Sequence, residues 1–351
     1  MTGTTIGHGL VAPAVEFAGF WRRIGAALLD TILLGMVGWI IGTMAQDWLL
    51  QLGPQARLLG LPLSLAYVTI GNSRFGGGGT LGKHALGIAV VGRGGAAISL
   101  SRSLWRGLVY QVPFYVNGYD FGFIAMTPLA MTAVGGIAIF LVFGVAGSDV
   151  YLYLANWRTR QIAHDLAAGT FVVRKASAGV PVRVRINRLH LAVIAVLLAL
   201  PLAAIPAGYA YLGGDWLGGL SRSTGVNFDR IGNIQTAVNG EDGVLSSGVI
   251  LQTSNFSSFK GGASVTHSLV VTVVHRGALD EPEPFADRIA ARVLKVAPDA
   301  MGMEVLTVVV RVGYDIGISS SWRSQNFSHT PAEWRARLSG AKDVAPKPKT
   351  R

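Results

Sequence analysis

The stretch AGFWRRIGAALLD, residues 18–30, begins the first long apolar run of the chain. Arg22 and Arg23 stand at its start, and Asp30 lies inside it, seven residues after Arg23. A carboxylate within a membrane-length helix is costly, and such residues usually face a protein partner, a cavity or an ion path. The stretch therefore predicts a membrane helix whose carboxylate needs a partner from elsewhere in the chain.

The composition is typical of a membrane protein. Of the 351 residues, 50% are hydrophobic and only 14% are charged, whereas a soluble chain carries about 25% charged residues. The absence of cysteine excludes disulfides and cysteine-based metal sites. We expect no cleaved signal peptide here, because the first apolar run is too long for one and contains Asp30.

The formal charge of +11 is concentrated beside the apolar runs. Residues 73–106 carry five basic residues and no acid, and residues 156–188 carry seven basic residues against Asp165 alone. Cytoplasmic loops of membrane proteins carry such an excess of Lys and Arg, so we expect both segments in the cytoplasm. Residues 214–351 carry fifteen basic and thirteen acidic residues. Because this soluble part is nearly neutral, we do not expect it to bind nucleic acid.

The apolar runs predict an α-helical polytopic membrane protein with the N-terminal segment 1–23 in the cytoplasm. A membrane helix needs about 20 mostly apolar residues. The stretch between the two basic segments should cross twice, as a hairpin, because both segments belong on the same side. A re-entrant or interfacial first half of that hairpin, with four spans in total, is the alternative. The five expected spans are residues 24–50, 58–71, 104–126, 129–154 and 189–212.

The C-terminal part reads as a separate extracytoplasmic α+β domain, residues 214–341. It should follow a membrane core (residues 24–174) and a basic linker with the final helix (residues 175–213). We expect the Lys/Pro-rich tail, residues 342–351, to be disordered. β-Branched runs predict strands and helical spacing of apolar residues predicts helices. The expected strands are residues 249–253, 267–275 and 305–312, and the expected helices are residues 284–296 and 331–338.

Three separated motifs in residues 18–174 resemble the RDD family of bacterial membrane proteins. AGFWRRIGAALLD supplies Arg23 and Asp30 as the family's arginine and first aspartate, and RQIAHDLAAGTFVV, residues 160–173, supplies Asp165 as the second. GGTLGKHALGIAVVGRGG, residues 78–95, is similar to the family's glycine–lysine segment. The resemblance implies a membrane protein, and transport, including sodium–proton exchange for some members, has been suggested for the family. It does not cover the C-terminal domain.

Helix geometry separates Arg23 from Asp30. Side chains on a helix lean toward its N-terminus, so Arg23 leans away from Asp30 across two turns. We therefore expect Arg23 to form a structural ion pair with Asp165 at the cytoplasmic interface. Asp149 is the candidate companion of Asp30, since two buried carboxylates could share a proton or hold a cation. The alternative is that Asp149 marks a helix end near the surface.

Basic side chains flanking the spans should contact lipid phosphates. We expect this membrane-surface anchoring from Arg22, Lys83 and Arg106. GGGTLGKH, residues 77–84, approaches a P-loop, but His84 stands where the magnesium-binding hydroxyl belongs and no buried strand precedes it. We therefore expect no nucleotide there.

The sequence offers no enzyme site. The histidines at 84, 164, 190, 267 and 275 lack metal-ligand spacing. The stretch Ser319–Trp322 has no evident nucleophile–base partner, so we expect neither metal nor cofactor. The leading hypothesis is an ion or small-solute transporter of the bacterial inner membrane, coupled to protons or sodium, with the C-terminal domain outside. The alternative is a non-enzymatic scaffold or envelope factor that presents the outer domain to a protein partner. Expected partners are the lipid bilayer, a proton or monovalent cation, and an envelope protein.

Overall fold

The computed structural model describes residues 15–117, 119, 136–212, 228–257, 263–298 and 302–340. The contacts divide the chain into two compact units. The first unit comprises residues 1–36, 60–118 and 128–204, and the second comprises residues 37–59, 119–127 and 205–351. The predicted tail, residues 342–351, lies outside the described residues.

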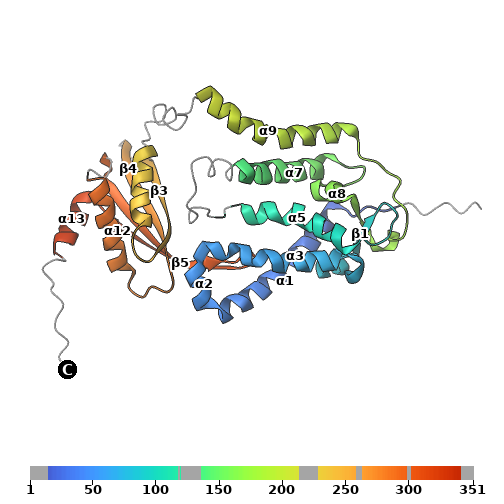
Figure 1. Ribbon diagram of the computed structural model, residues 1–351, viewed down its shortest axis with the longest axis horizontal. Helices are drawn as coiled ribbons and strands as arrows, with labels where there is room; N and C mark the ends of the chain where they lie inside the picture. Colours follow the sequence, from blue (N-terminus) through green and yellow to red (C-terminus); the bar gives the residue numbers. More distant parts are fainter. Residues whose placement is uncertain are drawn as a thin grey trace, which may run out of the picture. The chain divides into compact units, whose positions relative to one another are not determined.

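Long apolar helices build the first unit (Figure 1). Helix α3 packs on α5, and α5 packs on the π-helical segment that precedes α7. Gly144 in that segment lies against Leu198 of α9, where an added Cβ would be 3.4 Å from Leu198 Cδ2. These helices are α1 (Phe20–Met44, which continues into the second unit), α3 (Gly60–Asn72), α5 (Leu100–Val116), the π-helical segment (Phe140–Val145) with α7 (Ala146–Ala155), and α9 (Arg188–Leu212).

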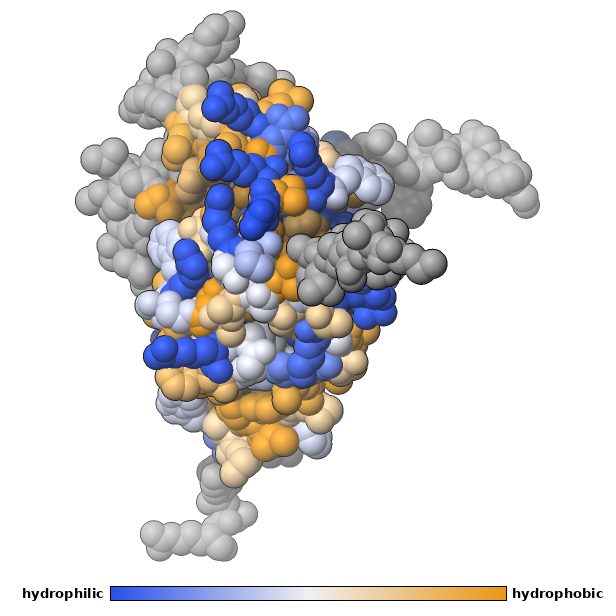
Figure 2. All heavy atoms as spheres, turned by 90° about the vertical axis from the view of Figure 1, so that its right-hand side faces the viewer, coloured by the Kyte–Doolittle hydropathy of each residue, from blue (hydrophilic) through white to orange (hydrophobic). Residues whose placement is uncertain are grey.

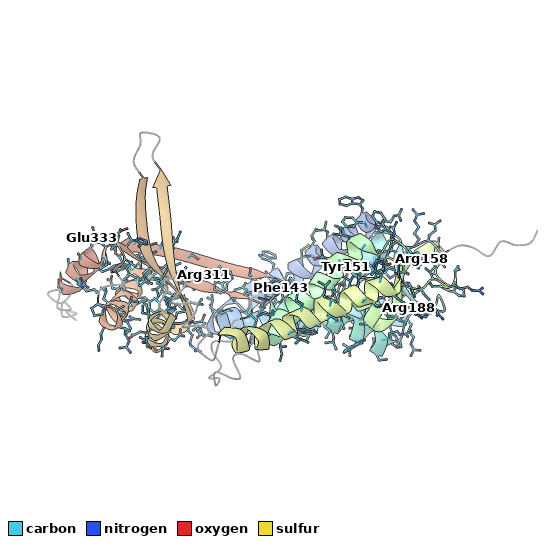
Figure 3. The ribbon with its side chains drawn as sticks, turned by 90° about the horizontal axis from the view of Figure 1, so that it is seen from above. Phe143, Tyr151, Arg158, Arg188, Arg311 and Glu333 are labelled. Carbon is cyan, nitrogen blue, oxygen red and sulfur yellow. The ribbon has the colours of Figure 1, made fainter. Side chains whose placement is uncertain are left out.

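Two described helices are long and apolar enough to cross a membrane. They are Phe20–Met44 and Gly136–Ala155, and Arg188–Leu200 is a shorter apolar stretch. Large apolar side chains of these two helices are exposed rather than packed in a protein core. Leu28 of α1 is 58% exposed, and Phe143, seen in Figure 3, is 67% exposed. The prediction of a helical membrane protein is thus supported in its coarse form, whereas the five spans and their orientation stay a prediction.

A small sheet lies at one end of the first unit. Strands β1 (Ile88–Gly92) and β2 (Thr170–Arg174) pair antiparallel from Ile88↔Arg174 to Gly92↔Thr170. Phe17 forms a further bridge to Val173, so the chain enters α1 directly from the sheet edge. All five residues of β1 are buried, which explains why IAVVG reads as a continuous apolar run rather than an alternating one.

Short helices connect this sheet to the long helices. Helix α4 (Leu81–Ala85) precedes β1, and α8 (Ala163–Ala168) precedes β2. Two single 3₁₀ turns, η2 (Arg74–Gly76) and η4 (Lys175–Ser177), belong to the same part of the first unit. The segment 73–99 therefore folds as a compact insert between α3 and α5.

The second unit contains the α+β domain predicted for the C-terminal part. Its four strands have the order β3-β4-β5-β6, with β4 and β5 parallel and the other pairs antiparallel. Both predicted helices and all three predicted strands are present, each strand longer than expected. The sequence analysis missed α11 and β6. The elements are α11 (Phe228–Asn239), β3 (Val244–Ser257), β4 (Ala263–His275), α12 (Pro282–Val296), β5 (Val305–Asp315), β6 (Ser320–His329) and α13 (Pro331–Gly340).

One face of this sheet forms the core of the domain. Leu269 and Val308 from the central strands and Ile289 from α12 are completely buried. Trp334 of α13 closes the core, and its indole Nε1–H donates to the Leu306 carbonyl at 2.9 Å. Parallel pairing of β4 and β5 requires a crossover connection, which α12 supplies.

Residues 37–59, assigned to the membrane core by the sequence analysis, fold with the C-terminal domain. The segment contains the end of α1, α2 (Gln46–Leu52) and the 3₁₀ turn η1 (Gly53–Leu59). Leu49 and Ala56 pack with Tyr314 of β5, and Arg57 forms an ion pair with Asp315. Within the second unit, an apolar contact and an ion pair therefore hold residues 37–59 to β5.

Candidate functional site

Asp165 of α8 is the centre of a buried charge cluster, which we define as Arg23, Arg106, Asp149, His164 and Asp165. The Asp165 side chain is 0% exposed. Its Oδ1 accepts hydrogen bonds from Arg106 Nη2 at 2.8 Å and Nε at 3.0 Å. Arg23, the partner predicted for Asp165, donates from Nη1 to Oδ2 at the longer distance of 3.4 Å. One carboxylate thus joins α1, α5 and α8.

The charges around Asp165 keep it ionised. Burial by itself would raise the pKa of this carboxyl, but Arg106, His164 and Arg23 together outweigh it through their charges and the Arg106 hydrogen bond, and they hold the pKa well below its usual range. Thr170 adds a hydroxyl donor to Oδ1 at 3.2 Å. A buried ion pair is stable only when its remaining hydrogen-bonding capacity is also used, and here Asp165 meets that condition.

Arg106 corrects the sequence analysis. It was expected to anchor the chain on lipid phosphates, but it is only 7% exposed and binds Asp165. The reason is its position on α5, where Ser103, Arg106 and Gln111 are all buried polar residues. Ser103 and Arg106 are three residues apart and so lie on one side of the helix, and this spacing was a recognisable signal of a buried polar face. Arg22 is exposed, as an anchor must be, and Lys83 is partly buried.

His164 and Asp149 extend the cluster from α8 to α7. Arg106 Nη2 lies 2.9 Å from His164 Nε2, and since an arginine can only donate, Nε2 accepts and the imidazole proton sits on Nδ1. That nitrogen lies 3.8 Å from Asp149 Oδ2. Asp149 also accepts a hydrogen bond from the backbone N–H of Ala163 at 2.6 Å, which fixes the start of α8. His164 therefore lies between the two carboxylates and is hydrogen-bonded to Arg106, while its Nδ1 makes no hydrogen bond.

The neutral state of His164 should make stability depend on pH. Burial and the Arg106 charge lower its pKa below 6.5, so in mild acid the unfolded chain binds a proton that the folded protein does not. Stability should therefore fall as the pH drops below about 6.5, and the loss should end at the folded-state pKa. In the variant His164→Gln, the amide can accept a hydrogen bond from Arg106 without titrating. The melting temperature of this variant should therefore change less between pH 7.5 and pH 5.5 than that of wild type. Equal slopes in both proteins would contradict this assignment.

Asp30 lies in a second, separate site on α1. Its carboxylate is 9% exposed and accepts three hydrogen bonds from neutral donors. Tyr67 Oη and Thr80 Oγ1 each donate at 2.5 Å, and the backbone N–H of Gly82 donates at 2.8 Å. The last contact satisfies a free amide in the first turn of α4, where Thr80 provides no side-chain cap. Asp30 thus anchors the glycine–lysine segment to α1.

Lys83 is the basic residue closest in sequence to this site. Its Nζ lies 3.4 Å from Thr80 Oγ1, the hydroxyl that donates to Asp30. Burial and the Arg106 charge lower the pKa of Lys83 to about 8. Its ammonium can therefore release a proton near neutral pH.

Asp30 and Asp149 each have their own partners. Among the described residues, Asp30 contacts Tyr67, Thr80 and Gly82, whereas Asp149 contacts α8. The hypothesis of a carboxylate pair is not supported by these contacts. The sequence analysis missed Tyr67 and Thr80, because neither belongs to a charged pattern and both reach Asp30 only after α3 and α4 have packed on α1.

Comparison with known proteins finds similarity in the N-terminal part of the chain. The model of the RDD family matches residues 17–169. We refer to the matched residues as the RDD domain. Their arginine and two aspartates occupy two neighbouring sites, Arg23 with Asp165 and Asp30 with α4. The match ends before the C-terminal α+β domain, and it supports the prediction of an RDD-type membrane protein.

The RDD domain also resembles a bacterial relative. The uncharacterized protein YckC of Bacillus subtilis (strain 168) is 26% identical over 155 residues, which cover 44% of this chain and 83% of that protein. No solved structure matches the chain. The likeness therefore concerns the RDD domain and carries no stated activity.

Proposed function

We propose that the RDD domain binds a monovalent cation at Asp30 in exchange for a proton. The observation that carries this proposal is the hydrogen bonding of Asp30: an almost completely buried carboxylate in an apolar helix receives neutral donors and, among the described residues, no ion pair. Asp165, by contrast, is neutralised by two arginines. Since no ion pair of Asp30 occurs among the described residues, a mobile cation could take the place that the arginines hold at Asp165.

The surroundings of Asp30 supply the chemistry that such an exchange needs. Hard cations bind oxygen ligands, and the Asp30 carboxylate lies within 2.5 Å of the Tyr67 and Thr80 hydroxyl oxygens. A cation beside Thr80 would add positive charge near Lys83 and lower its pKa further below about 8. Cation entry would therefore release the Lys83 proton, and cation loss would restore it.

The proposed location is the bacterial inner membrane. The sheet end of the first unit would lie in the cytoplasm and the C-terminal domain outside. The basic excess in residues 73–106 and 156–188 supports this orientation. Figure 3 shows two of these residues, Arg158 and Arg188, at the same end of the unit.

The central test is cation–proton exchange in everted membrane vesicles. The variant Asp30→Asn keeps the size of the side chain but removes its charge, and it should abolish the proton signal evoked by sodium or potassium. Asp47→Asn is a matched control, because Asp47 is an exposed acid of α2, and it should leave the signal unchanged. Identical traces from wild type and Asp30→Asn, at equal amounts of folded protein, would refute the proposal.

A second candidate is a scaffold that holds an envelope partner on the C-terminal domain. The observation that favours it is the second sheet face, where Ile250 is 61% exposed and Arg311 (Figure 3) lies 4.6 Å above the Trp322 ring. The two candidates respond differently to mutation. A scaffold should keep its cellular role in Asp30→Asn and lose it in Ile250→Lys, and a transporter should show the reverse.

A further inference from the structure

An open groove of about 570 Å³ lies at the entrance to α1. Three arginines line it, Arg22, Arg160 and Arg174, together with Phe20, Trp21 and Glu16. Figure 2 faces this end of the first unit and shows strongly hydrophilic side chains gathered beside hydrophobic ones. The groove is separate from the charge cluster and from Asp30, and neither of those sites uses its arginines.

Arg160 is held in the groove by a costly backbone conformation. Its φ of 52° is the sole positive value for a non-glycine residue in the described part of the chain. Left-handed backbone in such a residue costs about 1–3 kcal/mol and persists only where the surroundings enforce it. Asn156 enforces it here, because its Nδ2 donates to Thr159 Oγ1 at 2.7 Å and to the Gln161 carbonyl at 2.9 Å.

The guanidinium of Arg160 is available to a ligand. Within the described ranges it makes neither an ion pair nor a hydrogen bond. Its Nη1 lies over Gly19, where an added Cβ would be only 3.3 Å away. Gly19 thus makes room for the side chain to lie beside the start of α1.

The other two arginines also keep donors free. Arg174 uses Nη1 to bind Glu16 at 2.8 Å, and Arg22 uses Nη1 to bind the Leu86 carbonyl at 3.2 Å. A guanidinium has five N–H donors, so each retains several. With Glu16 counted, the groove carries a net charge of +2, which suits an anion that accepts several hydrogen bonds, such as a phosphate group.

The surroundings indicate a phosphate that carries acyl chains. Trp21 in the groove and Trp157 near Arg160 in sequence are 78% and 80% exposed, and exposed tryptophans are typical of the membrane–water interface. About two and three turns further along α1, Leu28 and Ile32 are each 58% exposed. A free phosphate ion would use only the arginines, whereas a phospholipid would also cover this apolar surface.

We propose that the groove of Arg22, Arg160 and Arg174 binds the phosphate of an anionic phospholipid, with Arg160 as its unpaired cationic ligand. The inference does not depend on cation exchange by Asp30. It assigns a role to Arg160, the first residue of the third RDD motif, which the charge cluster leaves unexplained.

The test measures lipid binding to the purified full-length protein in detergent by native mass spectrometry, with phosphatidylglycerol, phosphatidylcholine and inorganic phosphate as probes. Wild type should retain phosphatidylglycerol in preference to phosphatidylcholine and should not bind inorganic phosphate. Arg160→Gln should weaken phosphatidylglycerol binding about fivefold, the effect of one basic residue at an anionic surface. Arg93→Gln removes the same charge from an exposed position outside the groove and should bind as wild type does.

A second variant separates the cation from the backbone strain. Arg160→Gly relieves the left-handed conformation, so it should fold at least as stably as wild type and still bind phosphatidylglycerol about fivefold more weakly. Undiminished phosphatidylglycerol binding by Arg160→Gly would overturn the proposal. So would equal losses in Arg160→Gln and Arg93→Gln, which would indicate a diffuse charge effect, or binding of inorganic phosphate at the same site.

Discussion

The variant Asp165→Asn is expected to lose most of the stability of the RDD domain. It would leave Arg23 and Arg106 buried side by side, with side chains only 10% and 8% exposed and no carboxylate between them. Removing one partner of a buried ion pair costs about 3–5 kcal/mol. Thermal unfolding of the full-length protein in detergent should show a large fall in melting temperature or no folded protein, whereas the exposed control Asp47→Asn should unfold as wild type does.

A swap of the charged residues at positions 23 and 165 tests whether Arg23 or Arg106 is the more important partner of Asp165 for stability. The swap Arg23→Asp with Asp165→Arg would restore stability if these two residues formed an isolated pair. The structure predicts no rescue, because Arg106 lies closer to Asp165 than Arg23 does, at 2.8 Å against 3.4 Å. The new Arg at position 165 would face Arg106. A swapped protein that melts at the wild-type temperature would contradict the central place of Arg106.

The second large effect is expected from a single methyl group at Gly82. A Cβ there would overlap the Ala26 carbonyl oxygen of α1 and would lie 2.8 Å from Asp30 Oδ1. Since a backbone atom cannot move aside like a flexible side chain, Gly82→Ala should push α4 off α1 and break the hydrogen bond to Asp30. Overpacking of this kind costs about 1–3 kcal/mol, which the same thermal unfolding assay should detect.

Gly94→Ala is the matched control for this substitution. Gly94 lies in the same glycine-rich segment and has no atom within 4 Å of an added Cβ. It should therefore melt within a degree or two of wild type. A melting temperature for Gly82→Ala that equals that of Gly94→Ala would show that α4 does not rest on α1 as described.

The RDD motifs were recognisable in the sequence because their residues are charged or glycine in an apolar setting. Arg23, Asp30 and Asp165 were identified by that contrast, and helix geometry was enough to separate Arg23 from Asp30. The α+β character of the C-terminal domain followed from β-branched runs and one amphipathic helix. The polar strand β6 escaped notice because its burial pattern is almost entirely exposed, so it lacks the alternation that predicts a strand.

Local sequence thus determined the membrane character, the family motifs and the main elements of the C-terminal domain, because each depends on neighbouring residues along one helix or strand. Only the tertiary structure decided the partners. Tyr67 and Thr80 reach Asp30, and Arg106 reaches Asp165, from elements that are 37 to 59 positions away in the chain. Which buried polar groups meet depends on how the helices pack against one another. The periodicity of a sequence indicates which face of a helix is polar, but it does not indicate which residue of another element that face will contact.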